Sequence, residues 1–366
     1  MTCEVHGRFD VSLQFRPGCA MLELRQATRA AGREPVLIAV DLSCTRETPT
    51  SLLGLSPQGR DVVLRLLSGK EKLQGGAIRL DGKNIGQMRK GKAGIIRVGP
   101  EGVPKSGQKV GKMVNAALAA QVGLSDRMAA SANSLDTEGR LRLALAKALQ
   151  ARPALLLLDA PAADLTPDAR ARFTADLGQM VAGSGAVVVL AAGAADEAAG
   201  LGGAAVVLAD GQVQQSGPVV DVFDQPANLA SAIATAWPSL NRLAMTMDGG
   251  RGRLTDGSSL HPPDGLALPA SGQCVLAFRA DDSALARETP GCTRFVVRAS
   301  GEETVSGRTY ERVSFGGAAW LSPLDTAPPP LGAVLNLFVA RGKLMAFDAK
   351  GGAIPQPAPE RGASAV

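Results

Sequence analysis

A strand–loop–helix pattern at residues 52–69 limits the possible fold more than any other stretch of this sequence. The segment LLGLSPQGRDVVLRLLSG starts with an apolar run, passes through a glycine-bracketed loop and ends in helical spacing. Gly54 and Gly59 are five residues apart, as in the phosphate-binding loop G-x-x-x-x-G-K-[ST], but Arg60 and Asp61 replace its lysine and its hydroxyl residue. The pattern predicts an α/β domain and leaves two alternatives open: a vestigial loop without a ligand, or weak nucleotide binding.

Further apolar runs continue this pattern from Met21 to about residue 235. RPALLLLDAP (152–161) predicts a buried strand that ends in an acid, and GAVVVLAAG (185–193) predicts another. AAVVLADGQVQQSG (204–217) predicts a strand followed by an Asp-Gly hairpin turn, and residues 168–185 have helical spacing. Alternating strands and helices favour a sheet with helices packed on it.

The composition changes after residue 235. Short alternating runs separated by Gly, Pro, Asp and Ser fill residues 240–352 and predict a β-barrel-like module. The segment 353–366 is rich in Pro and Ala, which predicts a disordered tail. MLEL at Met21 resembles the beginning of a domain. Residues 1–20 are therefore interpreted either as a short N-terminal extension or as the result of a wrongly assigned start codon.

The composition excludes several classes of protein. A length of 366 residues favours two domains. The five cysteines are odd in number and lack C-x-x-C spacing, and only two histidines occur, so we expect a reducing compartment and no disulfide framework, zinc site or histidine-rich metal site. The net charge of +5 is spread along the chain, which argues against nucleic acid as a partner. No apolar run reaches the ~18–20 residues of a membrane span.

Five segments, taken in order, resemble ABC-transporter ATPases of the carbohydrate and polyol importer type. They are residues 52–85, which contain the phosphate loop, and residues 140–165, 207–228, 275–282 and 336–354. The resemblance implies an α/β, P-loop NTPase-like ABC cassette at 21–235 with a shortened helical subdomain at about 110–135, and a C-terminal all-β (TOBE/OB-like) barrel domain at 240–352. It also implies ATP and Mg²⁺ as cofactors, a permease as partner, and a cytoplasmic location that is peripheral on the inner face of the membrane when a permease is bound.

The chemistry-bearing positions of this family are altered here. Asp159 matches the acid that orients Mg²⁺, but Ala160 replaces the glutamate that polarises the attacking water. Loss of a general base commonly lowers a rate by ~10²–10⁴. Pro100, with Glu101 as an alternative, matches the Mg²⁺-sensing glutamine, and Gly193 matches the histidine that grips the γ-phosphate. No catalytic residue is intact, and Gly54, Gly59, Arg60, Asp61 and Asp159 form at most a weak or vestigial nucleotide and magnesium site.

The signature segment is altered as well. Leu135–Gly139 stands where the family has Leu-Ser-Gly-Gly-Gln, and it reads as a helix start capped by Asp136 or Thr137. Thr166 replaces an acid of the loop after Asp159, and TRAAGRE (28–34) offers no aromatic ring for adenine. In the family, one subunit's phosphate loop faces the other subunit's signature, so both halves of the composite site are degenerate.

Four functions follow from these observations. The first is an accessory, hydrolysis-defective subunit of a sugar or polyol importer, paired with a standard ABC ATPase or with a second copy. The second is a retired paralogue that serves as a scaffold or regulatory protein. The third is an active importer ATPase with an unusual site, and the fourth is a small-molecule binder that uses the barrel module.

Overall fold

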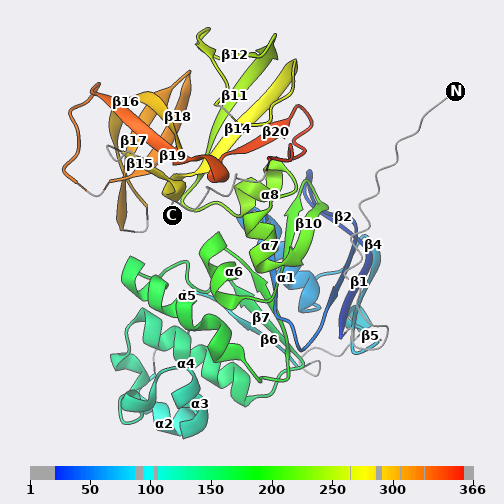
Figure 1. Ribbon diagram of the computed structural model, residues 1–366. Coiled ribbons are helices and arrows are strands. Elements are labelled where there is room, and N and C mark those ends of the chain that lie inside the picture. Colours follow the sequence, from blue (N-terminus) through cyan, green and yellow to red (C-terminus); the bar gives the residue numbers. More distant parts are fainter. Residues whose placement is uncertain are drawn as a thin grey trace, which may run out of the picture. The chain divides into compact units, whose positions relative to one another are not determined.

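The computed structural model describes residues 21–87, 94–102, 106–263, 265–285, 291–305, 307–324 and 326–357 (Figure 1). Its contacts divide the chain into two compact units, each with its own hydrophobic core. The first unit runs to Leu165 and resumes with Ala169–Asp224; the second joins Thr166–Asp168 to the chain from Gln225 onward. The sequence placed residues 225–235 in the first domain, whereas the structure packs Ala232 in this segment against Ala277 and Phe347 of the second unit.

A six-stranded sheet forms the centre of the first unit, in the order β10-β9-β3-β8-β7-β6. The strands are β3 Thr50–Leu53, β6 Ile95–Val98, β7 Leu155–Asp159, β8 Val187–Ala191, β9 Ala204–Ala209 and β10 Gln212–Pro218. The strands expected at 152–161, 185–193 and 204–217 are thus confirmed. All neighbours run parallel except β9 and β10, which are joined by the expected Asp210-Gly211 turn with φ of +51° and +75°.

A smaller antiparallel sheet lies on the other side of helix α1, Pro57–Leu67. Its order is β2-β1-β4-β5, with β1 Leu22–Ala31, β2 Glu34–Cys44, β4 Gly75–Leu80 and β5 Lys83–Asn84. Helix α1 contacts β1 and β2 on one side and β7 on the other, so its apolar residues join both sheets in one core. The strand–loop–helix pattern at 52–69 therefore builds the centre of this unit.

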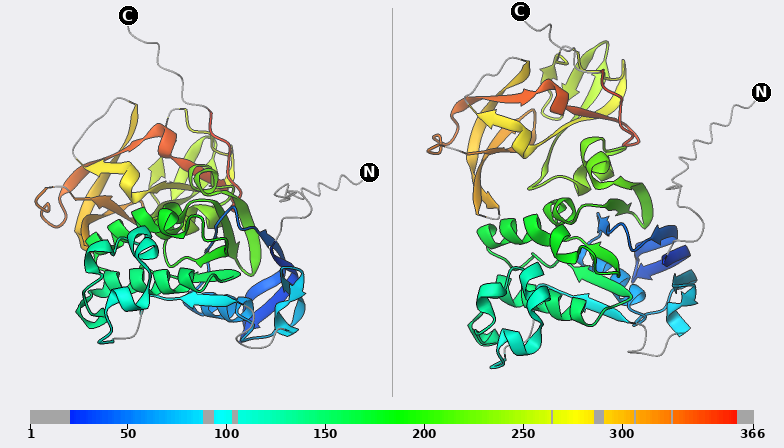
Figure 2. Two further views of the ribbon diagram at one scale, coloured as in Figure 1. Left: turned by 90° about the horizontal axis from the view of Figure 1, so that it is seen from below. Right: turned by 60° about the horizontal axis from the view of Figure 1, so that its bottom comes forward.

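Helices cover the remaining surfaces of the first unit. They are α2 Val110–Met113, α3 Ala116–Gln121, α4 Thr137–Gln150, α5 Pro167–Val181, α6 Ala195–Leu201 and α7 Val219–Asp224, with short 3₁₀ turns η1 Ile85–Gln87, η2 Ser125–Arg127 and η3 Ala132–Ser134. The segment 110–135 thus contains two short helices and two 3₁₀ turns. In Figures 1 and 2 the antiparallel sheet (blue) and helices α2–α4 lie at opposite ends of this unit.

The second unit consists mainly of two five-stranded antiparallel sheets that share one core. Trp320 and Phe295 from one sheet pack against Phe278 from the other, with ring centroids 5.0–6.3 Å apart. The sheets have the orders β13-β12-β11-β14-β20 and β15-β19-β16-β17-β18. The elements of this unit are α8 Leu229–Ala234, β11 Leu240–Asp248, β12 Arg251–Leu254, β13 Ser259–Leu260, β14 Gly272–Arg279, η4 Ala280–Asp282, β15 Ser283–Leu285, β16 Cys292–Val305, β17 Arg308–Phe315, β18 Ala318–Pro323, β19 Val334–Ala340, η5 Arg341–Lys343 and β20 Met345–Asp348.

The C-terminal tail differs from its expectation in part. The composition predicts disorder for residues 353–357, but Ala353 N donates to Ala227 O at 3.0 Å and Ile354 N donates to Ala346 O at 2.8 Å. These backbone bonds attach the segment to the second unit, which composition alone does not reveal. Residues 358–366 and the proposed N-terminal extension at 1–20, including Cys3, His6 and Cys19, lie outside the described residues.

Candidate functional site

Four parallel strands of the central sheet end at one edge, and each carries a residue that the sequence analysis singled out. Gly54 follows β3, the loop with Pro100 follows β6, Asp159 ends β7, and Gly193 follows β8. Because ligands of open α/β sheets bind beyond the carboxyl ends of the strands, this edge is the candidate site. The edge belongs wholly to the first unit.

The loop between β3 and α1 is fixed by close packing at Gly54 and by a helix cap at Ser56. Gly54 has φ of +82°, and a Cβ there would lie 2.4 Å from Leu208 O, so the close approach of β9 already demands glycine. Helix α1 begins at Pro57, which has no N–H, and Ser56 caps it by accepting a hydrogen bond from Gly59 N at 3.1 Å. The Ser56 hydroxyl donates in turn to Glu34 Oε1 at 2.8 Å. A carboxylate therefore lies against the helix N-terminus, where a phosphate would otherwise be favoured.

Arg60 and Asp61 belong to an alternating series of guanidinium and carboxylate groups, which we name the arginine–carboxylate chain. Its pairs include Arg65 Nη1 with Asp61 Oδ2 at 3.0 Å, Arg97 Nη1 with Asp61 Oδ1 at 3.5 Å, and Arg60 Nε with Asp159 Oδ1 at 4.0 Å. Its members in spatial order are Arg29, Glu71, Arg65, Asp61, Arg97, Asp159 and Arg60. Both acids of the predicted nucleotide site thus have arginine partners.

Arg97 is the central member of this chain. Its Nε donates to Asp159 Oδ2 at 3.2 Å, and its Nη2 donates to the same oxygen. Partial burial lowers the pKa of the Arg97 guanidinium, but the hydrogen bond and charge of Asp159, together with those of Asp61, outweigh burial and hold the pKa above its usual range. The guanidinium is therefore a permanent cation at this edge of the sheet.

This arrangement does not fit a bound magnesium ion. Mg²⁺ needs near-octahedral oxygen ligands at ~2.0–2.1 Å. Asp159 Oδ2 accepts from Arg97, and its Oδ1 faces Arg60, so a metal ion there would meet two guanidinium groups. Within the described part of the chain, no cluster of three or more His, Cys, Asp or Glu side chains is placed to hold a metal.

Ala160 and Gly193 face each other across the ends of β7 and β8. Ala160 is 2 % exposed and has φ of +37°, and a Cβ built on Gly193 would lie 2.9 Å from the Ala160 Cβ. Ala160 N donates to Ala191 O at 3.0 Å, which fixes the strand end. Two small residues therefore pack where the family resemblance places a glutamate and a histidine.

Glu197 of helix α6 is the carboxylate beside this pair. It is fully buried, and it accepts from Gly193 N at 2.6 Å and from Ala162 N at 2.8 Å. Burial raises the pKa of Glu197, while the two amide hydrogen bonds and the charge of Arg170 oppose the rise. Because it is fully buried and both oxygens accept from backbone amides, Glu197 holds the two loops together and is not placed to activate a water molecule.

The signature segment forms the start of helix α4. Of the two caps that the sequence allowed, the structure has Asp136, whose Oδ1 accepts from Gly139 N at 2.8 Å. Glu138 points inward, where Arg142 Nε donates to it at 2.9 Å and Arg172 Nη2 at 2.8 Å. A cavity of about 450 Å³ adjoins this turn. Some of the charged side chains that line this cavity, such as Glu138 and Arg142, already form ion pairs with each other.

The remaining predicted positions, Pro100, Glu101 and Thr166, lie in loops, whereas the ionic partners of Asp159 are Arg97 and Arg60. The Glu101 carboxylate folds back on Gly99, where an added Cβ would lie 2.2 Å from Oε2. Gly102 packs on the backbone of α4 at Arg140, so the loop with Pro100 joins β6 to that helix. Thr166 immediately precedes Pro167, the first residue of α5.

Sequence reasoning missed two residues of the site, Arg97 and Glu197. A signal for Arg97 was present, because a single arginine interrupts the apolar run IIRV (95–98). Glu197 follows the glycine turn after β8 by four residues, but its burial depends on loops that are distant in sequence.

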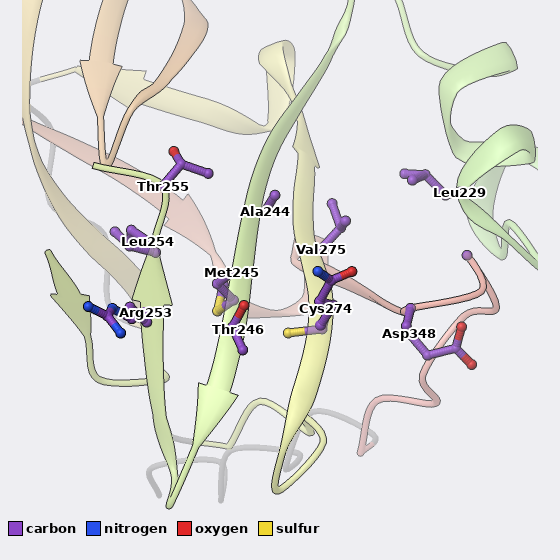
Figure 3. Close-up of a pocket in the computed structure, with 13 residues that line it drawn as sticks. Leu229, Ala244, Met245, Thr246, Arg253, Leu254, Thr255, Cys274, Val275 and Asp348 are labelled. Carbon is purple, nitrogen blue, oxygen red and sulfur yellow. The ribbon is translucent and has the colours of Figure 1, made fainter. Parts of the chain in front are cut away.

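A second cavity, of about 350 Å³, lies in the second unit (Figure 3). It is bounded by β11, β12 and β14, by Leu229 of α8 and by the turn after β20. Its volume is at the small end of the ~300–1,000 Å³ range of ligand pockets. Asp348 Oδ1 already accepts from Lys350 N at 2.8 Å and from Gly352 N at 2.9 Å, which leaves this acid committed to its own turn.

Comparison with known proteins identifies the fold of the first unit. Residues 37–163 match the family described as ABC transporter. A solved structure described as cbiO1 from Clostridium perfringens, part of the ABC transporter complex cbiONQ, superposes with a TM-score of 0.50 at 21% identity, over 57% of this chain and 92% of that one. The first unit has the fold of an ABC transporter ATP-binding cassette.

Two curated relatives of this cassette are import proteins by name. The Fe(3+) ions import ATP-binding protein FbpC of Streptomyces coelicolor is 30% identical over 57% of this chain and 65% of its own length. The sn-glycerol-3-phosphate import ATP-binding protein UgpC 1 of Rhizobium johnstonii is 26% identical over 74% of this chain and 79% of its own. The match therefore spans less than two thirds of FbpC. In the part of the chain that the structure describes, no helix is both long and apolar enough to cross a membrane.

Proposed function

We propose that this chain is an ATP-binding-cassette subunit of an import system, that it is defective in ATP hydrolysis, and that it acts as an accessory or regulatory subunit. The cassette fold of the first unit and the import proteins among its relatives support the first part. The second unit is proposed to be a TOBE/OB-like barrel domain, on the basis of its two antiparallel sheets around one core. The transported solute is proposed only as a sugar or polyol, from the resemblance of the motifs.

One observation carries the proposed loss of hydrolysis: Asp159 accepts hydrogen bonds from Arg97, with Arg60 Nε 4.0 Å from its other oxygen, and the next residue is Ala160. The hydrogen bonds from Arg97 to Asp159 compete with Mg²⁺ for this carboxylate. The alanine side chain has no group that could orient or deprotonate a water molecule. Position 159 would then lack a bound metal ion, and position 160 would lack the general base. ATP and Mg²⁺ would bind weakly or not at all in this proposal.

The partners follow from the same proposal. A permease and a standard ABC ATPase, or a second copy of this chain, would complete the assembly at the cytoplasmic face of a membrane. Nucleic acid is not proposed as a partner, since the positive charge is spread along the chain.

Two measurements on the purified full-length chain test the loss of hydrolysis. Calorimetry with Mg-ATP is expected to give weak binding or none, and phosphate release is expected to equal a protein-free blank. A turnover of ~1 s⁻¹, within the ordinary range of enzymes, contradicts the proposal and favours an active ATPase. A standard cassette ATPase assayed in parallel provides the positive control.

The signature turn favours a second candidate, a scaffold outside transport. In an asymmetric pair, the subunit without hydrolysis is expected to lend its signature to the partner's site. Here Asp136 caps α4 and Glu138 is held by Arg142 and Arg172, so two acids with internal partners stand where the resemblance places serine and glycine. Affinity purification from native membranes separates the two candidates: recovery of a permease or an ABC ATPase supports the accessory subunit, and recovery of neither supports the scaffold.

A further inference from the structure

Arg97 connects the two positions at which P-loop NTPases hold their metal ion. In those enzymes Mg²⁺ is held by the hydroxyl of the phosphate loop and by the acid that ends the second motif. The matching positions here are Asp61 and Asp159. Arg97 Nη1 lies 3.5 Å from Asp61 Oδ1, and Arg97 Nε lies 3.2 Å from Asp159 Oδ2.

Strand register explains how Arg97 reaches both acids. In the parallel pair β6–β7, Arg97 is the partner of Leu157. Leu157 and Asp159 lie on the same face of β7 because alternate residues of a strand share a face. The side chain of Arg97 therefore extends toward the strand end, where Asp159 and the first turn of α1 meet.

The carboxylate at position 61, in place of the hydroxyl of the phosphate-loop motif, is consistent with a cation that the protein itself supplies. A carboxylate beside anionic phosphates is unfavourable, whereas a carboxylate beside a fixed guanidinium is favourable. Arg65 contacts the other oxygen of Asp61 and continues to Glu71 at 2.9 Å, so the cation at the centre is held from α1 as well as from β7.

We propose that Arg97 is a built-in cation that takes the place of the metal ion and fixes α1, β6 and β7 in one arrangement without nucleotide. The proposal rests on the proposed function only for the assignment of positions 61 and 159 to a former nucleotide site. A cassette with such a cation keeps its phosphate loop and its Asp159 strand connected whether or not ATP is present.

Cation competition is the first test. Mn²⁺, a paramagnetic substitute for Mg²⁺, is titrated without nucleotide into full-length wild-type protein, R97Q, R97K and R97Q/D159N, and bound metal is measured by electron paramagnetic resonance. R97Q is expected to bind Mn²⁺ at least ~10-fold more tightly than wild type, because two carboxylates lose their guanidinium. R97K and R97Q/D159N are expected to stay at the wild-type level. Equal affinities of wild type and R97Q overturn the proposal.

The second test measures stability. Urea unfolding of wild type, R97Q, D159N and the double variant gives a double-mutant cycle. A guanidinium that clamps Asp159 predicts a coupling of ~10-fold in the unfolding equilibrium constant, as for a partly buried charged hydrogen bond. The Arg25–Glu23 pair, with an exposed arginine and an N–O distance of 3.1 Å, is the control and is expected to couple by less than ~3-fold. Coupling at the control level overturns the proposal.

These tests keep the proposal and the proposed function separate. Neither uses nucleotide, so ATP turnover by the wild-type chain contradicts the proposed function without deciding the role of Arg97. If R97Q does not fold, the same cycle is run with R97K. Lysine keeps the charge but not the fork, so ~3-fold or greater coupling to Asp159 supports the built-in cation, and no coupling overturns it.

Discussion

Arg97 in β6 donates two hydrogen bonds to Asp159 at the end of the neighbouring strand β7, so the protein itself neutralises the acid that we propose as the former metal ligand. The residue that follows, Ala160, is buried against Gly193 and has no polar side-chain group. The edge of the sheet is thus filled by internal partners at the positions where a ligand would bind. Such an edge favours a cassette that keeps one conformation, and each of its contacts can be tested separately.

Gly54 is expected to be required by the fold and not by a ligand. In G54A the new Cβ would lie 2.4 Å from Leu208 O at a φ of +82°, which forces β3 and β9 apart. We expect G54A to lower the free energy of unfolding by at least ~2 kcal/mol, measured in urea without nucleotide.

Gly32 provides the control for Gly54. It has φ of +62°, and no atom lies within 4 Å of its added Cβ, so G32A carries only the backbone strain of a positive φ. The two variants are expected to differ by the carbonyl clash. Equal losses of stability in G54A and G32A would show that the approach of Leu208 is not what fixes Gly54.

The small pair Ala160–Gly193 is expected to be coupled. G193A places two Cβ atoms 2.9 Å apart and is expected to cost about 1–3 kcal/mol in urea unfolding, as overpacked cores do. The same substitution in an A160G background is expected to cost clearly less, because the opposing Cβ is gone. G107A, where no atom lies within 4 Å of the added Cβ, is the control. A full cost of G193A in the A160G background argues against the contact.

Local patterns of the sequence predicted much of the fold. The strand and helix around Gly54, the buried leucines before Asp159 and the Asp210-Gly211 turn each depend on residues within a few positions of one another. Turn chemistry and apolar spacing are enough in such cases. The sequence does not decide between Asp136 and Thr137 as cap because both side chains can accept the bond, and only the geometry of the turn selects Asp136.

The partners of the site residues could not be predicted in the same way. Arg97 contacts Asp159 and Asp61, which are 62 and 36 residues away in the sequence, so the pairs form only once the strand order is set. Glu197 likewise accepts from Ala162, 35 residues away. The ordered residues 353–357 also depend on distant backbone groups. Composition and motif spacing carry no information on these contacts.

Asp136 is expected to stabilise α4 as an N-cap. D136A removes the acceptor of Gly139 N and is expected to lower the free energy of unfolding by about 1 kcal/mol. D136S, which introduces the serine that the resemblance places at this position, keeps an acceptor and is expected to stay within a few tenths of a kcal/mol of wild type. Chemical denaturation followed by circular dichroism gives both values. An equal loss in D136A and D136S would rule out the capping role.

Glu197 is expected to make stability depend on pH. Because burial raises its pKa above the ordinary value of 4.5, the folded chain binds this proton more tightly than the unfolded chain does. Stability from this group is then greatest below pH 4.5 and falls as the pH rises from 4.5 through the folded pKa. The loss is about 1.4 kcal/mol for each unit by which the pKa is raised.

The variant E197Q isolates this effect, since glutamine does not titrate. The free energy of unfolding of wild type minus that of E197Q, from urea titrations at a series of pH values, is expected to decrease with rising pH across that window. The introduced glutamine keeps one acceptor oxygen for two amides, those of Gly193 and Ala162, so a constant offset is expected in addition. Taking the difference cancels the titration of Asp196 and of other acids common to both proteins. A difference that stays constant with pH would mean that the amide hydrogen bonds and Arg170 balance burial, and one that increases with pH would mean that they outweigh it.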